Sequence, residues 1–186
     1  DLHRENQLWA IDSCNPDCSA GAQAYMDKSA ADFCHFQEMR LAQDAAISAA
    51  QRTARRSGWG LAVTPAVVTD KLGINSGVAV AARSFFGMRA HTLSDIGTEA
   101  QGRISATHIG ACCRGGIHLV SLYLWCSEGL SERNLDVLQC AAHALSTLHG
   151  PWIVAADFNC TPEDLASTAW PQLVKGCIVH ADAPSC

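Results

Sequence analysis

Two polar residues directly follow a strongly apolar run near the end of the chain. Asp157 and Asn159 come after residues 152–156 in the segment GPWIVAADFN, one residue apart. A run this apolar predicts a central strand covered on both faces, which would hold the two side chains rigidly at the edge of a sheet. Chemistry in open α/β sheets gathers at such strand ends. A carboxylate and an amide in this place therefore predict metal-assisted chemistry on a phosphate group.

Two further residues extend the candidate site. Glu38 follows the apolar run FCHF, and Tyr123 lies in LVSLYLW. Glu38 would bind Mg²⁺, with Mn²⁺ as the alternative ion, because hard cations take carboxylate oxygens and keep other positions for water and phosphate. Asp157 would orient or deprotonate the attacking water, and Asn159 would hold that water or a phosphate oxygen. Tyr123 would donate a hydrogen bond to the phosphate as charge accumulates.

Each of these residues also has a plainer interpretation. Glu38 would suit the N-terminal dipole of the helix that follows it, and Tyr123 alone is typical of a core tyrosine. Asp157 and Asn159 could form an Asx-type turn between a strand and a helix. Only their combination, in this order along one chain, favours the catalytic interpretation.

The elements that would position these residues alternate between strands and helices. Apolar runs bounded by turn residues predict strands at 8–11, 33–36, 61–68, 77–82, 103–108, 117–124 and 152–156. Helices are expected at 19–31, 41–56 and 131–149, with Ser131 as an N-cap, and a short one opens at Thr161 and Pro162. The strands from 61 to 124 predict a meander of neighbours. The whole pattern predicts an α/β sandwich of two mixed β-sheets flanked by helices.

Composition limits the classes of protein. With 186 residues and 48% of them hydrophobic, residues 1–186 are expected to form a single domain. A net charge of −5 gives no long-range attraction to nucleic acid, so any polyanion must be met locally. The cluster Arg52, Arg55 and Arg56 ends a predicted helix, which favours dipole complementation over a nucleic-acid patch. No segment is apolar for long enough to cross a bilayer, so no membrane role is expected.

The ten cysteines do not predict a disulfide framework. The chain is long enough to be stable without disulfide bonds, and it shows no apolar leader at its start. Reduced thiols in an intracellular protein, nuclear or cytoplasmic, are therefore expected. The spacing of Cys14 and Cys18, with Cys34 and His35 later, lacks the second tight ligand pair of a zinc site.

The order of motifs resembles the endonuclease/exonuclease/phosphatase superfamily, which includes exonuclease III-like and retrotransposon endonucleases. The resemblance covers most of the chain and is carried by FQE, LVSLYLW and AADFN, where Ala156 replaces a usual glycine, and by NSGVAVAAR and QGRISATH. It implies that Glu38 is the metal carboxylate, that Tyr123 is a reactive-site residue, and that Asp157 and Asn159 belong to the family's GDFN motif. It also implies nucleic acid as the substrate.

The chain departs from this family's pattern at two places. The family has an asparagine at the end of its first strand, and WAIDSCN offers Asp12 or Asn15 without a clean counterpart. The family's closing Asp-His pair is expected beyond Cys186, since His180 and Asp182 stand where the family has an ordinary strand end. On this resemblance the domain is expected to be C-terminally incomplete, without its last strands.

The leading hypothesis is a metal-dependent phosphodiester hydrolase, a DNA endonuclease similar to those of retroelements. The alternatives are an inactive remnant or interaction module of the same fold, favoured by the missing Asp-His pair, and a phosphatase acting on lipids or small phosphoesters. Substrate choice lies in loops that the sequence does not position.

Overall fold

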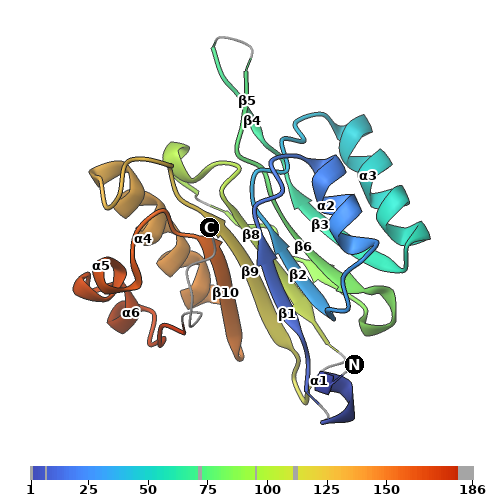
Figure 1. Ribbon diagram of the computed structural model, residues 1–186. Coiled ribbons are helices and arrows are strands. Elements are labelled where there is room, and N and C mark those ends of the chain that lie inside the picture. The colour runs from blue at the N-terminus through green and yellow to red at the C-terminus, as the bar shows by residue number, and fades with distance from the viewer. Residues whose placement is uncertain (1, 7, 71–72, 95, 111–112, 180–186) are drawn as a thin grey trace.

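Two β-sheets packed face to face form the centre of the molecule (Figure 1). A computed structural model describes residues 2–6, 8–70, 73–94, 96–110 and 113–179. The strands of the first sheet, in spatial order, are β1 (Ile11–Cys14), β2 (Phe33–Phe36), β6 (Val78–Arg83) and β3 (Trp59–Thr64). Those of the second are β10 (Trp152–Asp157), β9 (Ile117–Tyr123), β8 (Ile104–Ile109) and β7 (Arg89–Ala90). A separate hairpin, β4 (Val67–Val68) and β5 (Ile74–Asn75), projects from the sandwich.

Both sheets are mixed, as the sequence predicts. The pairs β1–β2 and β9–β10 are parallel, and the pairs β2–β6, β3–β6, β8–β9 and β7–β8 are antiparallel. Each parallel pair brings two strand ends to the same edge of its sheet. These edges carry the candidate site.

Helices cover the outer face of each sheet, so the layers run helices, sheet, sheet, helices (Figure 1). The first sheet is covered by α2 (Ser19–Met26) and α3 (Asp44–Arg56), and the second by α4 (Glu132–Thr147), α5 (Pro162–Ser167) and α6 (Trp170–Leu173). The short elements are α1 (Leu2–Glu5), η1 (Ser84–Phe86) and η2 (Thr98–Ala100). None of the described helices is long and apolar enough to cross a membrane.

The hydrophobic core has three layers that follow this arrangement. One cluster lies between the first sheet and its helices, including Phe36 and Trp59, and another lies between the second sheet and α4, including Leu122 and Leu138. The third cluster joins the two sheets and contains Phe33, Val80, Ala82, Ile109 and Leu119. Because side chains alternate along a strand, each central strand contributes to the inner layer and to an outer one.

The two strongest helix predictions are confirmed. Ser131 caps α4, since its Oγ accepts a hydrogen bond from the backbone nitrogen of Asn134, and Thr161 forms a capping box with Asp164 before α5. α4 buries Leu138 and Leu145 against the second sheet, whereas Leu135 is 44% exposed.

Three strand predictions were wrong. The run 61–68 is not one strand, since β3 ends at Thr64 and Val67–Val68 forms β4 in the separate hairpin. The first strand is Ile11–Cys14 and not 8–11, because Leu8 and Trp9 are 61% and 44% exposed and only the later residues pair with β2. The strands from 61 to 124 do not form a meander: β3 and β6 join the first sheet, whereas β8 and β9 join the second. The residue patterns of these four strands are alike, so only the long-range pairing of strands decides which sheet each one joins.

Candidate active site

The four candidate residues lie where β2, β9 and β10 end, on the side of the second sheet that faces the first. In β9 the odd-numbered residues point inward: Leu119 packs in the layer between the sheets, and Ser121 donates to the carbonyl of Phe36 at 3.0 Å. Tyr123 continues this alternation as the last residue of the strand. It is paired in parallel register with Asp157, the last residue of β10.

Glu38 meets Tyr123 across the two sheets. The tyrosine hydroxyl donates a hydrogen bond to Oε1 of Glu38, and Nη2 of Arg40 lies 3.4 Å from Oε2. The Glu38 side chain is only 16% exposed. Its backbone has a φ of 53°, a left-handed conformation that non-glycine residues rarely adopt and that is concentrated at functional sites. Glu38 and Tyr123, two of the predicted site residues, are therefore in contact.

Asp157 is held by a residue that the sequence interpretation left unassigned. Nδ2 of Asn15 donates to Oδ2 of Asp157 at 3.1 Å, although the two residues are 142 positions apart. The other candidate, Asp12, points the opposite way and accepts from the hydroxyls of Tyr25 at 2.8 Å and Ser29 at 3.0 Å. Alternation along β1 would have found this, because Ile11 faces the inner layer and Asn15 continues its phase.

Asn159 lies beside the same edge with its amide already engaged. Its Nδ2 donates to the carbonyl oxygen of Leu124 at 3.0 Å, and its φ is 49°. The side chain thus ties the turn after β10 to the end of β9. A second hydrogen on that nitrogen and the amide oxygen carry no bond among the described residues, so Asn159 can still meet a ligand.

A buried glutamine locks the loop that presents Glu38. Nε2 of Gln37 donates to Oγ of Ser121 at 3.2 Å and to Oγ of Ser13 at 3.3 Å. Gln37 is 1% exposed and Ser121 fully buried, so these bonds are shielded from water. The ends of β1, β2 and β9 are thereby joined directly beneath the candidate site.

The electrostatics keep the Tyr123 phenol protonated. Burial raises its pKa well above the ordinary value for tyrosine, and the hydrogen bond and negative charge of Glu38 raise it further. A neutral phenol has one proton to donate. Tyr123 can give it to Glu38 or to a ligand oxygen, but not to both.

The donor set suits a hard divalent cation. Glu38 and Asp157 offer carboxylate oxygens and Asn159 an amide oxygen, which is the chemistry of a Mg²⁺ site that keeps several waters. Among the described residues no three His, Cys, Asp or Glu side chains gather as a metal cluster, so a closed site of protein ligands is not formed there. The Cys14, Cys18 and Cys34 set shows no zinc cluster either. His180 and Asp182 lie outside the described residues.

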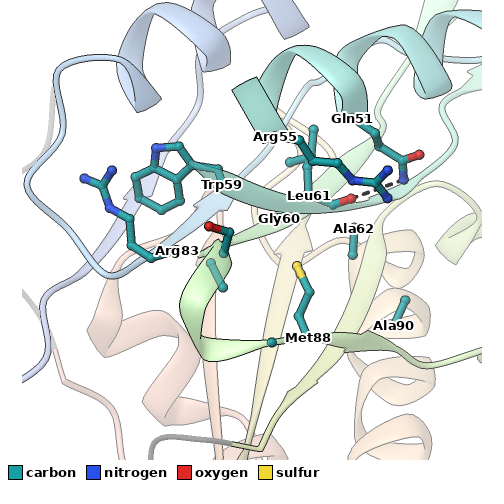
Figure 2. Close-up of a pocket in the computed structure, with 12 residues that line it drawn as sticks. Gln51, Arg55, Trp59, Gly60, Leu61, Ala62, Arg83, Met88 and Ala90 are labelled. Atoms are coloured by element: carbon teal, nitrogen blue, oxygen red, sulfur yellow. Dashed lines mark hydrogen bonds between the residues drawn. The ribbon is translucent and has the colours of Figure 1, made fainter. Parts of the chain in front are cut away.

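A hollow lies elsewhere on the protein and contains none of these residues. It measures ≈ 410 Å³ and is bounded by α3, β3 and the segment 82–90, with Arg55 and Gln51 on one wall and Met88 on another (Figure 2). Gly60 in its floor pairs through Ala82 with the first residue of β2, whereas Glu38 follows the last. The hollow is therefore at the opposite end of the first sheet from the candidate site.

Comparison with known proteins gives likeness in structure alone. No protein-family model matches the sequence, and no curated protein matches it. A humanized TDP2 from D. rerio superposes with a TM-score of 0.53 at 15% identity, covering 86% of this chain and 69% of that one. AP endonuclease LMAP from Leishmania major gives 0.54 at 17%, covering 79% and 53%. ANGEL2, described as a 2′,3′-cyclic phosphatase, gives 0.55 at 12%, covering 88% and 56%.

These three proteins are members of the endonuclease/exonuclease/phosphatase superfamily. The chain has the fold of that superfamily, which confirms the resemblance seen in its sequence. It spans little more than half the length of LMAP and ANGEL2. The expectation of an incomplete domain stays a prediction.

Proposed function

We propose that the chain is a metal-dependent phosphodiester hydrolase whose substrate is DNA, cut internally in the manner of retroelement endonucleases. The observation that carries the proposal is the convergence of Asn15, Glu38, Tyr123 and Asp157, from four strand ends, through the hydrogen bonds Asn15–Asp157 and Tyr123–Glu38. Structural core packing needs no such set of polar groups at one edge. Proteins of the same fold include an AP endonuclease and a cyclic phosphatase, which agrees with chemistry on phosphate esters.

Each residue has a defined task in this proposal. Glu38, with Asp157 and Asn159 nearby, would hold a Mg²⁺ ion, which when bound supplies positive charge to phosphate oxygens. The Asp157 carboxylate orients the attacking water and takes its proton, and Asn15 keeps that carboxylate pointed into the site. The Tyr123 phenol leaves Glu38 and donates to a non-bridging phosphate oxygen, which becomes a better acceptor as charge develops on it.

Plasmid nicking tests the proposal. The purified chain should convert supercoiled DNA to the nicked form with Mg²⁺ and lose this activity with a chelator. Asp157→Ala should lower the rate by about 100-fold or more, the usual contribution of a general base. Asp136→Ala is the matched control, because Asp136 is an exposed carboxylate on α4, away from the site. Equal rates for Asp157→Ala and Asp136→Ala would exclude the role assigned to Asp157.

Two alternatives make different predictions. An interaction module of the same fold is favoured by one observation: among the described residues, no histidine is hydrogen-bonded to Glu38, Tyr123, Asp157 or Asn159. Wild-type protein that binds DNA without nicking it would support that alternative. A phosphatase on small phosphoesters is favoured by the net charge of −5, and it should hydrolyse a phosphomonoester faster than bis(p-nitrophenyl) phosphate.

The proposed place of action is inside the cell, in the nucleus or cytoplasm. The eight cysteines that the structure describes are all free thiols, which supports a reducing compartment.

A further inference from the structure

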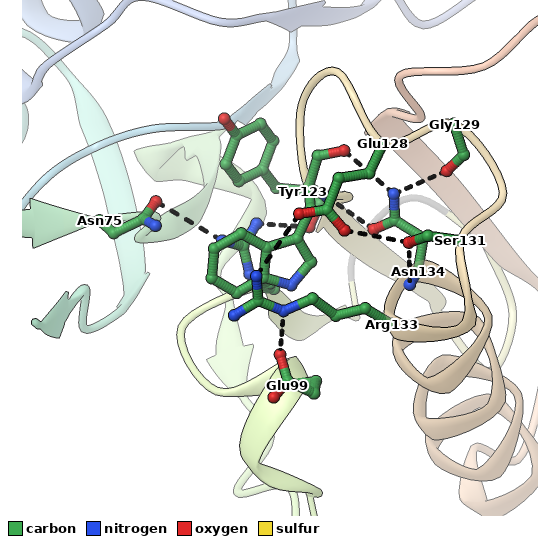
Figure 3. Close-up of polar contacts among 10 residues, drawn as sticks. Asn75, Glu99, Tyr123, Glu128, Gly129, Ser131, Arg133 and Asn134 are labelled. Carbon is green, nitrogen blue, oxygen red and sulfur yellow. Dashed lines mark hydrogen bonds and ion pairs between the residues drawn. The ribbon is translucent and has the colours of Figure 1, made fainter.

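The side chains of Arg103, Trp125 and Arg133 form a stack beside Tyr123. Figure 3 shows Arg133 of this stack with its partner Glu99. The guanidinium carbon of Arg103 is 3.4 Å from the centroid of the Trp125 ring, and that of Arg133 is 3.3 Å from the same ring. Two groups cannot lie so close to one centroid on the same side, so they cover opposite faces. Arg103 is also 5.0 Å from the centroid of the Tyr123 ring. The inner cation of the stack therefore faces the candidate catalytic tyrosine.

Arg103 is a costly residue at this position. It is 1% exposed, and its guanidinium donates to the carbonyl of Tyr123 at 3.3 Å and to Oδ1 of Asn75 at 3.5 Å. No described carboxylate forms an ion pair with it. Burial lowers its pKa to about 10. A buried cation without a counterion costs stability that an apolar side chain would not, so a role beyond packing explains it better.

The outer half of the stack is built to keep Trp125 in place. Arg133 is hydrogen-bonded to Glu99, and its Nη1 lies 3.4 Å from Oε1 of Glu128. Asn134 accepts from the Trp125 nitrogen at 2.7 Å and donates to the Trp125 oxygen at 3.0 Å. The indole Nε1 is buried with no described hydrogen-bond partner. Trp125 therefore interacts through the faces of its ring, which attract cations, and not through its indole N–H.

Arg103 reaches Tyr123 both through the backbone and through its charge. The Tyr123 nitrogen donates to the Arg103 carbonyl at 3.0 Å, while the guanidinium returns a bond to the Tyr123 carbonyl. The guanidinium also lies 5.0 Å from the centroid of the Tyr123 ring, so Arg103 contacts both the backbone and the ring of this tyrosine.

We infer that Arg103, held by Trp125 and Arg133, is a positioning residue for Tyr123: its guanidinium fixes the tyrosine ring so that the phenol points at Glu38. The expected effect of Arg103 on turnover rests on the proposed hydrolase function. The expected effect of Arg103 on the orientation of the Tyr123 phenol rests on the geometry alone, and separate experiments measure the two effects.

Fluorine NMR of the phenol tests the inference without any activity. The chain has two tyrosines, so Tyr25→Phe leaves Tyr123 as the only reporter after incorporation of 3-fluorotyrosine. In that background, at neutral pH, Arg103→Met should move and broaden the Tyr123 fluorine resonance, because the ring loses the group that fixes it. Arg103→Lys should restore most of the original position. Arg56→Ala, which removes an exposed arginine far from the stack, should change nothing.

A substitution of the exposed Arg133 provides a second test in case the buried substitution Arg103→Met prevents folding. Arg133 is 41% exposed, so Arg133→Ala should fold, release Trp125 and move the Tyr123 fluorine resonances, with Arg133→Lys in between. If DNA is nicked, both Arg103→Met and Arg133→Ala should lower kcat by about 10-fold or more with little change in KM. An unchanged Tyr123 fluorine resonance in both Arg103→Met and Arg133→Ala would overturn the inference. Absence of nicking by the wild type would instead refute the hydrolase proposal and leave the NMR result standing.

Discussion

His35 should make the protein lose stability in mild acid. This histidine lies in β2, fully buried between the sheets, with Nδ1 3.4 Å from the Asp12 carbonyl and with Nε2 unbonded among the described residues. Burial lowers its pKa from 6.5 to about 4, since the charged form would lose its hydration. Protonation would therefore occur at the centre of the element that presents Glu38.

The magnitude follows from the pKa difference between the folded and unfolded states. In the unfolded chain His35 takes up a proton near pH 6.5, whereas the folded chain does not until about pH 4. Between these values the unfolded state binds more protons, so stability falls as the pH falls and is full only above 6.5. At 1.36 kcal/mol per pKa unit the loss is about 2 kcal/mol at pH 5 and about 3 kcal/mol at pH 4.

Urea denaturation followed by circular dichroism at several values between pH 7.5 and 4.5 measures this effect. His35→Leu should flatten most of the pH dependence at an unchanged m-value. Some slope should survive, because burial and the neighbouring His118 also lower the pKa of His91. His143→Leu is the control, since His143 is exposed on α4. If wild type and His35→Leu lose stability in parallel down to pH 5, the reasoning about His35 is wrong.

Three further predictions concern other residues of the structure. Asn15→Ala removes the hydrogen bond to Asp157 and should lower kcat for nicking by about 10–100-fold, the cost of losing an orienting partner; an unchanged kcat would remove Asn15 from the site. Asn134→Leu leaves three half-buried backbone groups of the loop before α4 without their partner and should cost about 2 kcal/mol in urea denaturation, whereas a cost below about 0.5 kcal/mol would show that the loop rearranges. Cys34 is buried with its pKa raised to about 12, so its thiolate is about 1,000-fold scarcer than that of an ordinary thiol, and iodoacetamide at pH 8 should modify exposed Cys18 in the native protein long before Cys34. Mass spectrometry of both peptides measures the two rates, and equal rates would contradict the burial.

The sequence predicts the local parts of the fold and of the site well. Ser131 and Thr161 mark two helix starts because capping depends on neighbouring residues only. Asp157 and Glu38 were recognisable as polar residues after apolar runs, and the structure places both next to Tyr123. The inward direction of Asn15 follows from the alternation of β1, whereas its partner Asp157 lies in the other sheet and is not given by that alternation.

Other features depend on partners that local patterns do not name. The runs that become β6 and β8 look alike, yet one pairs with β2 and β3 and the other with β9. The stack of Arg103, Trp125 and Arg133 joins residues 30 positions apart through ring faces, for which spacing gives no signal. Such contacts are fixed by the docking of whole elements, so they become visible only in three dimensions.

The hydrogen bonds of the candidate site run from the first sheet to the second, and each sheet has its own outer core. Each half of the molecule alone therefore carries only part of the candidate site. Phe33 and Leu119 belong to the apolar layer that keeps the halves in register. A shift of one sheet against the other by one residue would leave both outer cores intact, yet it would separate Tyr123 from Glu38 and Asn15 from Asp157. On the proposed function, activity therefore depends on how the two sheets are packed together, and substitutions that weaken the layer between them should abolish activity before they unfold the protein.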